Sequence, residues 1–272
     1  MPPIYLYGKE RTLKNILKKL EHVQKIILFL DYDGTLVPIR KLPALAAIST
    51  QTRKLLRQLS EQKKITLVIS TGRAHADINR LLGLKNLTIV SNHGFQIHYK
   101  NKTWVHPQVN KMLPLLNELS RKLNALRKSI DSVLVENKKY TVTVHYRNVP
   151  ADQINVVKSF VASMSEKYFP FVKITHGKKV LEIRPNIMWN KGLAVQKVLR
   201  TFHAQKKKYS AVYIGDDTTD EDAFKVLGKS SLTVKVGSGK KTFAKYFVRN
   251  TDEVMQFLKI VVNRNYQWNS DG

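Results

Sequence analysis

Two aspartates separated by one tyrosine, Asp31 and Asp33, follow an apolar run in the segment KIILFLDYDGTLVPI (residues 25–39). The run lacks the alternation of a half-exposed strand, so it predicts a central parallel strand that is covered on both faces. Two carboxylates at the end of such a strand repel each other and resist desolvation unless a cation or hydrogen bonds compensate them. The Gly34-Thr35 turn is expected to leave both at the carboxyl edge of the sheet.

Other apolar runs also end in polar residues. ITLVIS (65–70) leads into Thr71-Gly72-Arg73, LTIV (87–90) into Ser91-Asn92-His93-Gly94, and AVYI (211–214) into Gly215-Asp216-Asp217. Segments of helical period lie between them, such as KGLAVQKVLRTF (191–202). Alternating strands and helices predict an α/β fold with a doubly wound, Rossmann-like parallel sheet. Ligands of such sheets bind beyond the carboxyl ends of the strands.

The middle of the chain has a different pattern. Between about Lys100 and Val180 we expect a long helix (PLLNELSRKLNALRKSI), a strand pair, a second helix (INVVKSFVASMSEKYF) and another strand pair. YTVTVHY (140–146) alternates strictly, as a sheet with one solvated or ligand-facing side does. The sequence thus predicts a core of residues 1–99 and 184–272 with an inserted α/β cap domain of residues 100–183.

The polar strand ends indicate phosphate chemistry with a metal ion. Asp31, Asp33, Asp216 and either Asp217 or Asp220 are expected to converge, and a cluster of hard oxygen ligands favours Mg²⁺. With Mg²⁺ on a phosphate oxygen, one carboxylate can attack phosphorus while the other handles the proton of the leaving group.

Two further residues could contact the phosphoryl group in this hypothesis. Lys191 opens the helix of NKGLAVQ and could balance its charge, and Thr71 could donate a hydrogen bond to it. Each segment also has a plainer explanation. An acidic pair can cap a turn, TGR and KG can simply begin helices, and GDDTTDEDAF can be an acid-rich first turn favoured by the helix dipole. Their common placement on one inferred sheet favours a shared site.

The order LFLDYDGTL, VISTGR, KG, YIGDDTTDEDAF resembles the haloacid dehalogenase superfamily of phosphotransferases. Within it the chain is similar to the trehalose-6-phosphate phosphatases, through SNHG (91–94), VENKKYTVTVHYR (135–147), LEIRPNIMWNKG (181–192) and GDDTTDEDAF (215–224). The resemblance implies hydrolysis of trehalose 6-phosphate to trehalose and phosphate through an aspartyl-phosphate, the last step of trehalose biosynthesis. It implies Asp31 as nucleophile and Asp33 as general acid and base.

The resemblance also assigns the remaining site residues. Thr71 and Lys191 are expected to hold the phosphoryl group. Asp31, Asp33 through its carbonyl, and Asp216 are expected to bind Mg²⁺, with Asp217 and Asp220 in support. The expected substrate-binding residues are Arg73, His93, Gly94, Glu136, Lys138, His145, Arg147, Glu182 and Arg184. A plainer explanation of Glu136 and Glu182 is pairing with nearby lysines on a solvated sheet. The chain departs from the common family pattern at Asn137, where an acidic residue is frequent, and in lacking a glycine before Tyr140.

Alternative functions are a phosphatase for another sugar phosphate, of the sucrose or glycosylglycerate type, and a catalytically silent regulatory domain. The intact Asp31, Asp33, Lys191 and Asp216 argue against silence. The net charge of +27, from 47 basic and 20 acidic residues, admits anionic partners. The lysines are scattered, however, and no nucleic-acid-binding module is recognisable, so we expect a small-molecule substrate and no nucleic-acid partner.

Composition excludes several classes of site. The absence of cysteine excludes disulfides, thiol nucleophiles and cysteine-bound zinc. The start MPPIYLYGKE lacks the plan of a signal peptide, and no apolar stretch approaches the length of a membrane span. We therefore expect a cytoplasmic protein without membrane contact, and favour a monomer.

Overall fold

The computed structural model describes residues 2–203, 209–228, 230–237 and 241–270. The chain divides into two compact units, one of residues 1–103 and 190–272 and one of Trp104–Trp189. The sequence placed the second boundary before Arg184. In the structure it follows Trp189, because β10 (Val180–Pro185) pairs with β9 (Val172–Gly177) along its whole length.

The first unit is built on a nine-stranded sheet of order β1-β13-β12-β11-β2-β3-β4-β5-β6. The pairings from β1 to β4 are parallel, and β5 runs antiparallel to β4. The predicted doubly wound α/β core is thereby confirmed. The strands are β1 (Ile4–Tyr5), β2 (Lys25–Asp31), β3 (Ile65–Ser70), β4 (Thr88–Ser91), β5 (Gln96–Tyr99), β6 (Lys102–Val105), β11 (Tyr209–Gly215), β12 (Leu232–Val236) and β13 (Tyr246–Val248).

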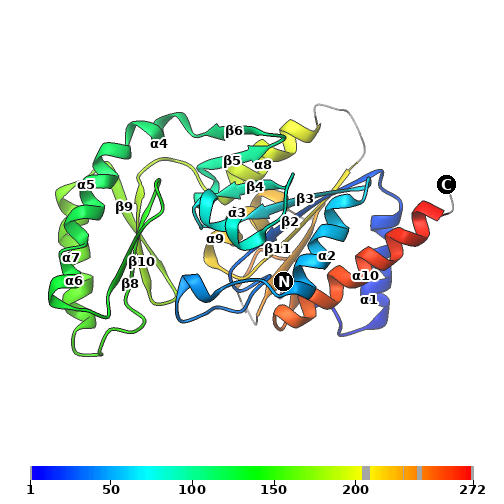
Figure 1. Cartoon of the computed structure of the whole chain (residues 1–272). Coiled ribbons are helices and arrows are strands. Elements are labelled where there is room, and N and C mark those ends of the chain that lie inside the picture. The colour runs from blue at the N-terminus through cyan, green and yellow to red at the C-terminus, as the bar shows by residue number, and fades with distance from the viewer. Residues whose placement is uncertain (1, 204–208, 229, 238–240, 271–272) are drawn as a thin grey trace. The chain divides into compact units, whose positions relative to one another are not determined.

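Helices cover both faces of this sheet (Figure 1). The α-helices of this unit are α1 (Glu10–Glu21), α2 (Thr50–Glu61), α3 (His75–Leu82), α8 (Lys191–His203), α9 (Thr218–Leu227) and α10 (Thr251–Ser270). Alternate side chains of β2 point to opposite faces of the sheet and pack against different helices. Ile26, Leu28 and Leu30 belong to one core with α1, α2, α3 and α10. On the other face Phe29 stacks on Tyr213, whose ring meets Phe224 of α9 edge to face.

Local sequence explains the helix boundaries. Ser49 caps α2, since its side chain accepts a hydrogen bond from the Thr52 amide at 3.0 Å. Buried residues then recur at helical spacing through Leu55, Leu56 and Leu59. Helix α3 ends at Gly83, whose φ of 59° lies in the left-handed region that favours glycine.

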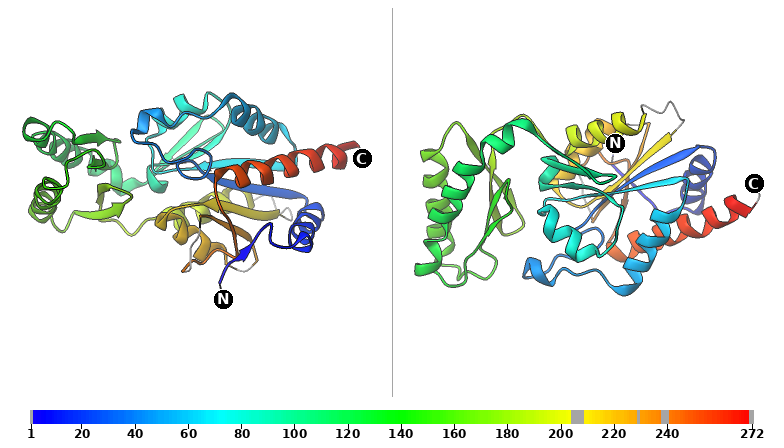
Figure 2. Two further views of the ribbon diagram at one scale, coloured as in Figure 1. Left: turned by 90° about the horizontal axis from the view of Figure 1, so that it is seen from below. Right: turned by 45° about the horizontal axis from the view of Figure 1, so that its top comes forward.

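The second unit has a four-stranded antiparallel sheet of order β7-β8-β10-β9, in which β7 is Leu134–Asn137 and β8 is Val142–His145. One sheet face packs on α5 (Leu113–Leu123) and α7 (Ile154–Lys167), as Figure 2 shows within this unit. Its end residues Trp104 and Trp189 lie side by side with ring centroids 5.3 Å apart. Two adjacent ends are what an inserted segment requires.

The prediction of one long helix over residues 114–130 is wrong, because this segment forms two helices, α5 and α6 (Leu126–Ser129). The break lies at Asn124, whose side-chain amide donates to the Ser120 carbonyl at 2.8 Å. Asparagine competes in this way for backbone groups and weakens a helix at that point. A short α4 (Pro107–Lys111) precedes α5, and two 3₁₀ turns, η1 (Pro43–Leu45) and η2 (Asn92–Gly94), complete the elements. Among the described residues, no helix is both long and apolar enough to cross a membrane.

Candidate active site

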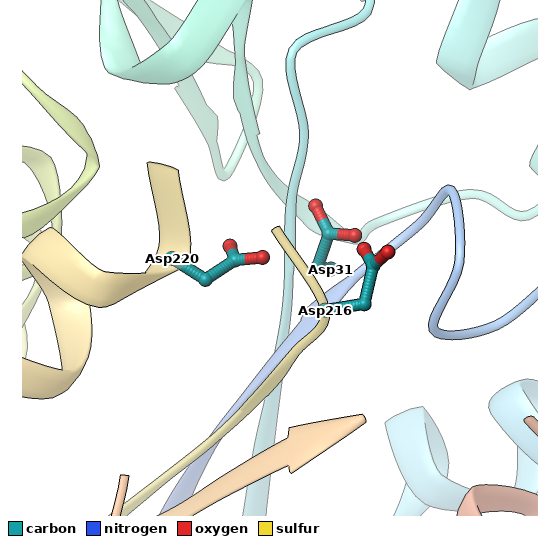
Figure 3. A group of neighbouring side chains, drawn as sticks. All are labelled: Asp31, Asp216 and Asp220. Atoms are coloured by element: carbon teal, nitrogen blue, oxygen red, sulfur yellow. The ribbon is translucent and has the colours of Figure 1, made fainter. Parts of the chain in front are cut away.

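The strand ends of the first unit bring carboxylates together because their strands are parallel neighbours. In the register of the sheet, Leu30 lies beside Ile214, and Asp31 lies beside Ser70. Asp216 follows the end of β11, and Asp220 lies in the first turn of α9. One oxygen from each of Asp31, Asp216 and Asp220 lies within 4.8 Å of the others. Figure 3 shows these three side chains, which we call the acidic triad.

Burial makes the acidic triad costly without a compensating charge. Asp31 is 5 % exposed, Asp216 is 9 % exposed and Asp220 is fully buried. The loop after Asp31 fits closely against Asp216, since a Cβ on Gly34 would lie 2.2 Å from the Asp216 Oδ2 atom. Gly34 also has a φ of 86°, which other residues rarely adopt. The turn therefore requires glycine for two reasons.

Lys191 supplies a cation at the triad. Its ammonium donates to Asp31 Oδ1 at 2.8 Å and to Asp220 Oδ1 at 2.7 Å, and the lysine is only 3 % exposed. The Tyr213 hydroxyl donates to the same Asp220 oxygen at 2.8 Å. Lys191 begins α8 and Asp220 lies in the first turn of α9, so this ion pair joins the first turns of two helices to the end of β2.

The electrostatic balance differs between the two carboxylates that Lys191 contacts. Burial raises the pKa of Asp31 well above its usual value, and Lys191 opposes this shift while Asp220 and Asp216 add to it. Burial would raise the pKa of Asp220 as well, but Lys191, the Asp217 amide and the Tyr213 hydroxyl together outweigh burial and hold that pKa below its usual value. The pKa of Lys191 is well above its usual value, because the two carboxylates outweigh its burial. A divalent cation would favour ionised Asp31, so the donor set fits a metal ion.

Asp217 lies outside the acidic triad and caps α9. Its carbonyl accepts from the Asp220 amide at 3.1 Å, and its own amide donates to Asp220 Oδ2 at 2.9 Å. These two hydrogen bonds fix the first turn of α9. Both oxygens of Asp220 thus accept hydrogen bonds within the protein. The geometry places Asp31 and Asp216 better than Asp217 or Asp220 for direct metal binding.

Asp33 has a different cation. The Arg73 guanidinium donates Nε to Asp33 Oδ2 and Nη2 to Asp33 Oδ1, both at 2.7 Å. Its Nη1 donates to Asp77 Oδ2 at 2.6 Å. The resemblance predicts that Arg73 binds substrate, and in the structure its guanidinium contacts these two aspartates.

The TGR and SNHG loops are interlocked beside this site. The Thr71 carbonyl accepts from the His93 amide at 3.0 Å, and the Arg73 carbonyl accepts from the Asn92 amide at 2.8 Å. A Cβ on Gly72 would lie 2.4 Å from the His93 ring. The Thr71 hydroxyl accepts from the Arg73 amide at 3.1 Å and keeps its O–H for another acceptor. Gly94 follows with a φ of 100°.

The predicted sugar-binding residues of the second unit mostly share one face of its sheet, opposite to the face that packs on α5 and α7. Glu136, Thr143, Glu182 and Thr175 form one row across β7, β8, β10 and β9. We call this the polar face. Glu136 Oε2 and His145 Nε2 lie 2.9 Å apart on it. Arg147 lies apart, where it donates to the Lys178 carbonyl.

Glu182 is the most enclosed residue of the polar face, with 6 % exposure. Its Oε1 accepts from Lys138 Nζ and from the hydroxyls of Thr141 and Thr143, each at 3.1 Å. Arg184 Nε lies 3.9 Å from its Oε2. The contact with Lys138 matches the plainer explanation of Glu182 as the partner of a lysine, although the residue is buried rather than on a solvated sheet, and the threonine contacts add to it. The alternation of YTVTVHY predicts that both threonines share one face of the sheet, and the cross-strand register brings them to Glu182.

The chain is similar to known trehalose-phosphate phosphatases in sequence and in structure. The family model of trehalose-phosphatase matches residues 29–252. The trehalose 6-phosphate phosphatase RA3 of Zea mays is 36% identical over 260 residues, covering 89% of this chain and 71% of the relative. The probable trehalose-phosphate phosphatase D of Arabidopsis thaliana is 37% identical over 254 residues, covering 88% and 68%. A crystal structure of a trehalose-6-phosphate phosphatase related protein superposes with a TM-score of 0.78 at 27% identity, covering 89% of this chain and 99% of that one.

A variant of Lys191 tests the buried ion pair. Lys191→Met keeps the length of the side chain and leaves Asp31 and Asp220 buried without their ammonium partner. We expect the free energy of unfolding at neutral pH to fall by about 3–5 kcal/mol, as when a buried pair loses one member. Urea unfolding beside the exposed variant Lys41→Met, which should change little, measures this loss.

The loss should also depend on pH. Since the pKa of Asp220 is lowered, its stabilising contribution is present above the usual value of 3.8 and is lost as the pH falls through the lowered pKa. The raised pKa of Lys191 keeps that ammonium charged throughout this range. The difference between wild type and Lys191→Met should therefore shrink on acidification. If the difference in free energy of unfolding between wild type and Lys191→Met grows on acidification, an ion pair between Lys191 and ionised Asp220 is contradicted.

Proposed function

The chain belongs to the trehalose-phosphatase family, and from that premise we propose that it hydrolyses trehalose 6-phosphate to trehalose and inorganic phosphate. The observation that carries the proposal is the arrangement of Asp31, Asp216 and Lys191 at the carboxyl edge of the sheet. It combines a nucleophile, metal-binding oxygens and a cation in one buried place.

We assign Mg²⁺ to the acidic triad on the chemistry of its donors. Carboxylate and carbonyl oxygens are the ligands that this ion prefers. The residues that would hold it are Asp31, Asp216 and the backbone carbonyl of Asp33, with Asp217 and Asp220 supporting them through the start of α9. Bound there, Mg²⁺ would offset the repulsion between the attacking carboxylate and the phosphate.

In this proposal the reaction takes two displacements at phosphorus. A carboxylate oxygen of Asp31 attacks phosphorus, the bond from phosphorus to the sugar oxygen breaks, and Asp33 gives that oxygen a proton. Asp33 then takes a proton from water, which attacks the phosphorus of the aspartyl-phosphate and releases phosphate and free Asp31. Lys191 lies on Asp31, where it can balance the charge of the phosphoryl group, and the Thr71 O–H can donate to one of its oxygens.

We assign recognition of the disaccharide to the polar face of the second unit. Sugar hydroxyls both donate and accept, so they suit a surface of carboxylates, an ammonium and imidazole. Glu136, Lys138, His145 and Glu182 supply these groups from β7, the β7–β8 turn, β8 and β10. Because Glu182 already accepts three hydrogen bonds on one oxygen, we expect it to hold Lys138 and both threonines in place.

A panel of phosphate esters tests the proposed substrate. Phosphate release from trehalose 6-phosphate should exceed that from glucose 6-phosphate, sucrose 6-phosphate and p-nitrophenyl phosphate by about a hundredfold or more in kcat/KM, because remote contacts contribute to the transition state. Asp31→Asn keeps the shape of the site but removes the nucleophile, and should lower every activity by about 10⁴-fold or more.

The outcomes of this panel test the identity of the substrate and the role of Asp31 as nucleophile separately. A wild type that prefers sucrose 6-phosphate or glucose 6-phosphate overturns the disaccharide assignment alone. Activity of Asp31→Asn within about tenfold of wild type would mean that another residue attacks phosphorus. A wild type that hydrolyses none of the esters with Mg²⁺ present would favour a catalytically silent domain.

Metal dependence is tested by removal and return. Exhaustive chelation should abolish hydrolysis, and Mg²⁺ should restore it. Ca²⁺ should restore it poorly, since its looser and larger coordination misplaces the attacking oxygen. Asp216→Asn should raise the Mg²⁺ concentration that gives half-maximal rate, while Asp252→Asn, at the start of α10, serves as an acidic control. Full activity after chelation contradicts the metal assignment.

A further inference from the structure

The contacts of Arg73 account for almost all of its hydrogen-bonding capacity. A guanidinium carries five N–H groups. Four of them are used: Nε and one Nη2 N–H on Asp33, one Nη1 N–H on Asp77, and the second Nη2 N–H on the Pro43 carbonyl at 3.0 Å. Arg73 is also only 6 % exposed. One N–H therefore remains for any substrate oxygen.

We propose that Arg73, held in place by Asp77, is a positioning residue that orients the carboxyl group of Asp33 for proton transfer. The inference rests on the proposed function, in which Asp33 handles the proton of the leaving group and of the attacking water. It adds Asp77 to the residues on which the reaction depends and moves Arg73 from substrate binding to the support of Asp33.

The geometry of the Arg73–Asp33 contact limits how Asp33 can turn. Two parallel N–H···O bonds, both 2.7 Å long, join Nε and Nη2 to the two carboxylate oxygens. Such a paired contact fixes the plane of the carboxylate as well as its position. Without it the Asp33 side chain, which is 39% exposed, would be free to rotate about its χ angles. A defined proton-transfer direction requires that restriction.

Arg73 can orient Asp33 only if it is itself fixed, and several groups fix it. Asp77 lies four residues along the chain, in the first turn of α3, and binds Nη1. The Arg73 Cζ atom lies 5.3 Å from the centroid of the buried Tyr32 ring. The Tyr32 hydroxyl in turn donates to the Ala46 carbonyl at 2.7 Å. The guanidinium is thus held by a carboxylate, a carbonyl and an aromatic face.

Asp77 is ionised in this arrangement. Burial would raise its pKa, but hydrogen bonds from Arg73 and Arg80 outweigh burial and hold the pKa below its usual value. The two arginines use different oxygens, with Arg80 Nη2 on Oδ1 at 2.8 Å and Arg73 on Oδ2. The Arg80 side chain is 70% exposed, so it offers a control that removes a partner of Asp77 on the solvent side.

A double-mutant cycle tests the inference. Arg73→Lys keeps the charge but cannot form the paired contact, and should lower kcat about a hundredfold with KM nearly unchanged. Asp77→Asn should lower kcat about tenfold, since Asp33 keeps a less restrained partner. Asp77→Glu should recover part of this loss, and Arg80→Gln should stay within about twofold of wild type.

The decisive comparison repeats Arg73→Lys and Asp77→Asn in the Asp33→Asn background. If Arg73 and Asp77 act through Asp33, each substitution should lower kcat by less than about twofold in the Asp33→Asn background, because the group that they orient is gone. Effects as large as in the wild-type background overturn the inference, as does a rise in KM at constant kcat. Thermal unfolding of each variant shows whether a loss of activity is due to misfolding. If Asp77→Asn fails to fold, the comparison of Arg73→Lys in the two backgrounds alone tests the inference.

The ester used in the cycle separates this inference from the proposed function. The cycle is run with whichever sugar phosphate of the panel the wild type hydrolyses fastest, since a sugar alkoxide needs a proton from Asp33 whichever sugar it belongs to, whereas p-nitrophenolate leaves without one. If the wild type prefers an ester other than trehalose 6-phosphate, the substrate assignment is overturned, but the double-mutant cycle can still be interpreted. A wild type that hydrolyses none overturns both, whereas an active wild type with independent effects overturns the inference alone.

Discussion

The stability of the first unit and the arrangement of its site depend on one interaction, the buried ion pair of the Lys191 ammonium with Asp31 and Asp220. Its two hydrogen bonds of 2.8 and 2.7 Å join the start of α8 to the end of β2 and the start of α9. All three groups are buried, so removing any one leaves a charge that water cannot reach. The parallel pairing of β11 and β2 brings the carboxylates to Lys191, because the carboxyl ends of neighbouring parallel strands lie at the same edge of the sheet.

The two aspartates of the DYD segment have separate cations, which supports the separate roles that we propose for them. Asp31 meets Lys191, and Asp33 meets Arg73. Tyr32 between them is buried in the main core and lies under the Arg73 guanidinium. One carboxylate is thus enclosed beside the other two carboxylates of the acidic triad, which suits the proposed attack on phosphorus. The other is partly exposed and restrained in its plane, which suits exchange of protons.

Much of this could be predicted from the sequence, because strand ends in a parallel sheet converge whatever their distance along the chain. That rule predicted the meeting of Asp31 and Asp216 but left Asp217 and Asp220 as alternatives, of which the structure brings Asp220 to the triad. The partner of Arg73 could not be predicted, since TGR locates its backbone while the rotamer depends on Asp77 and Tyr32. The threonines around Glu182 depend on cross-strand register, which alternation alone does not determine. The break at Asn124 depends on one side-chain hydrogen bond.

Trapping of the phosphorylated enzyme tests the central claim, that the buried site makes Asp31 the attacking group. Enzyme quenched during turnover of trehalose 6-phosphate and reduced with borohydride should contain homoserine at position 31, because borohydride reduces an acyl phosphate but not a free carboxylate. Peptide mass spectrometry locates the product, and enzyme quenched without substrate provides the blank. Homoserine at position 31 alone is the predicted result. Reduction at another aspartate or glutamate would contradict the account.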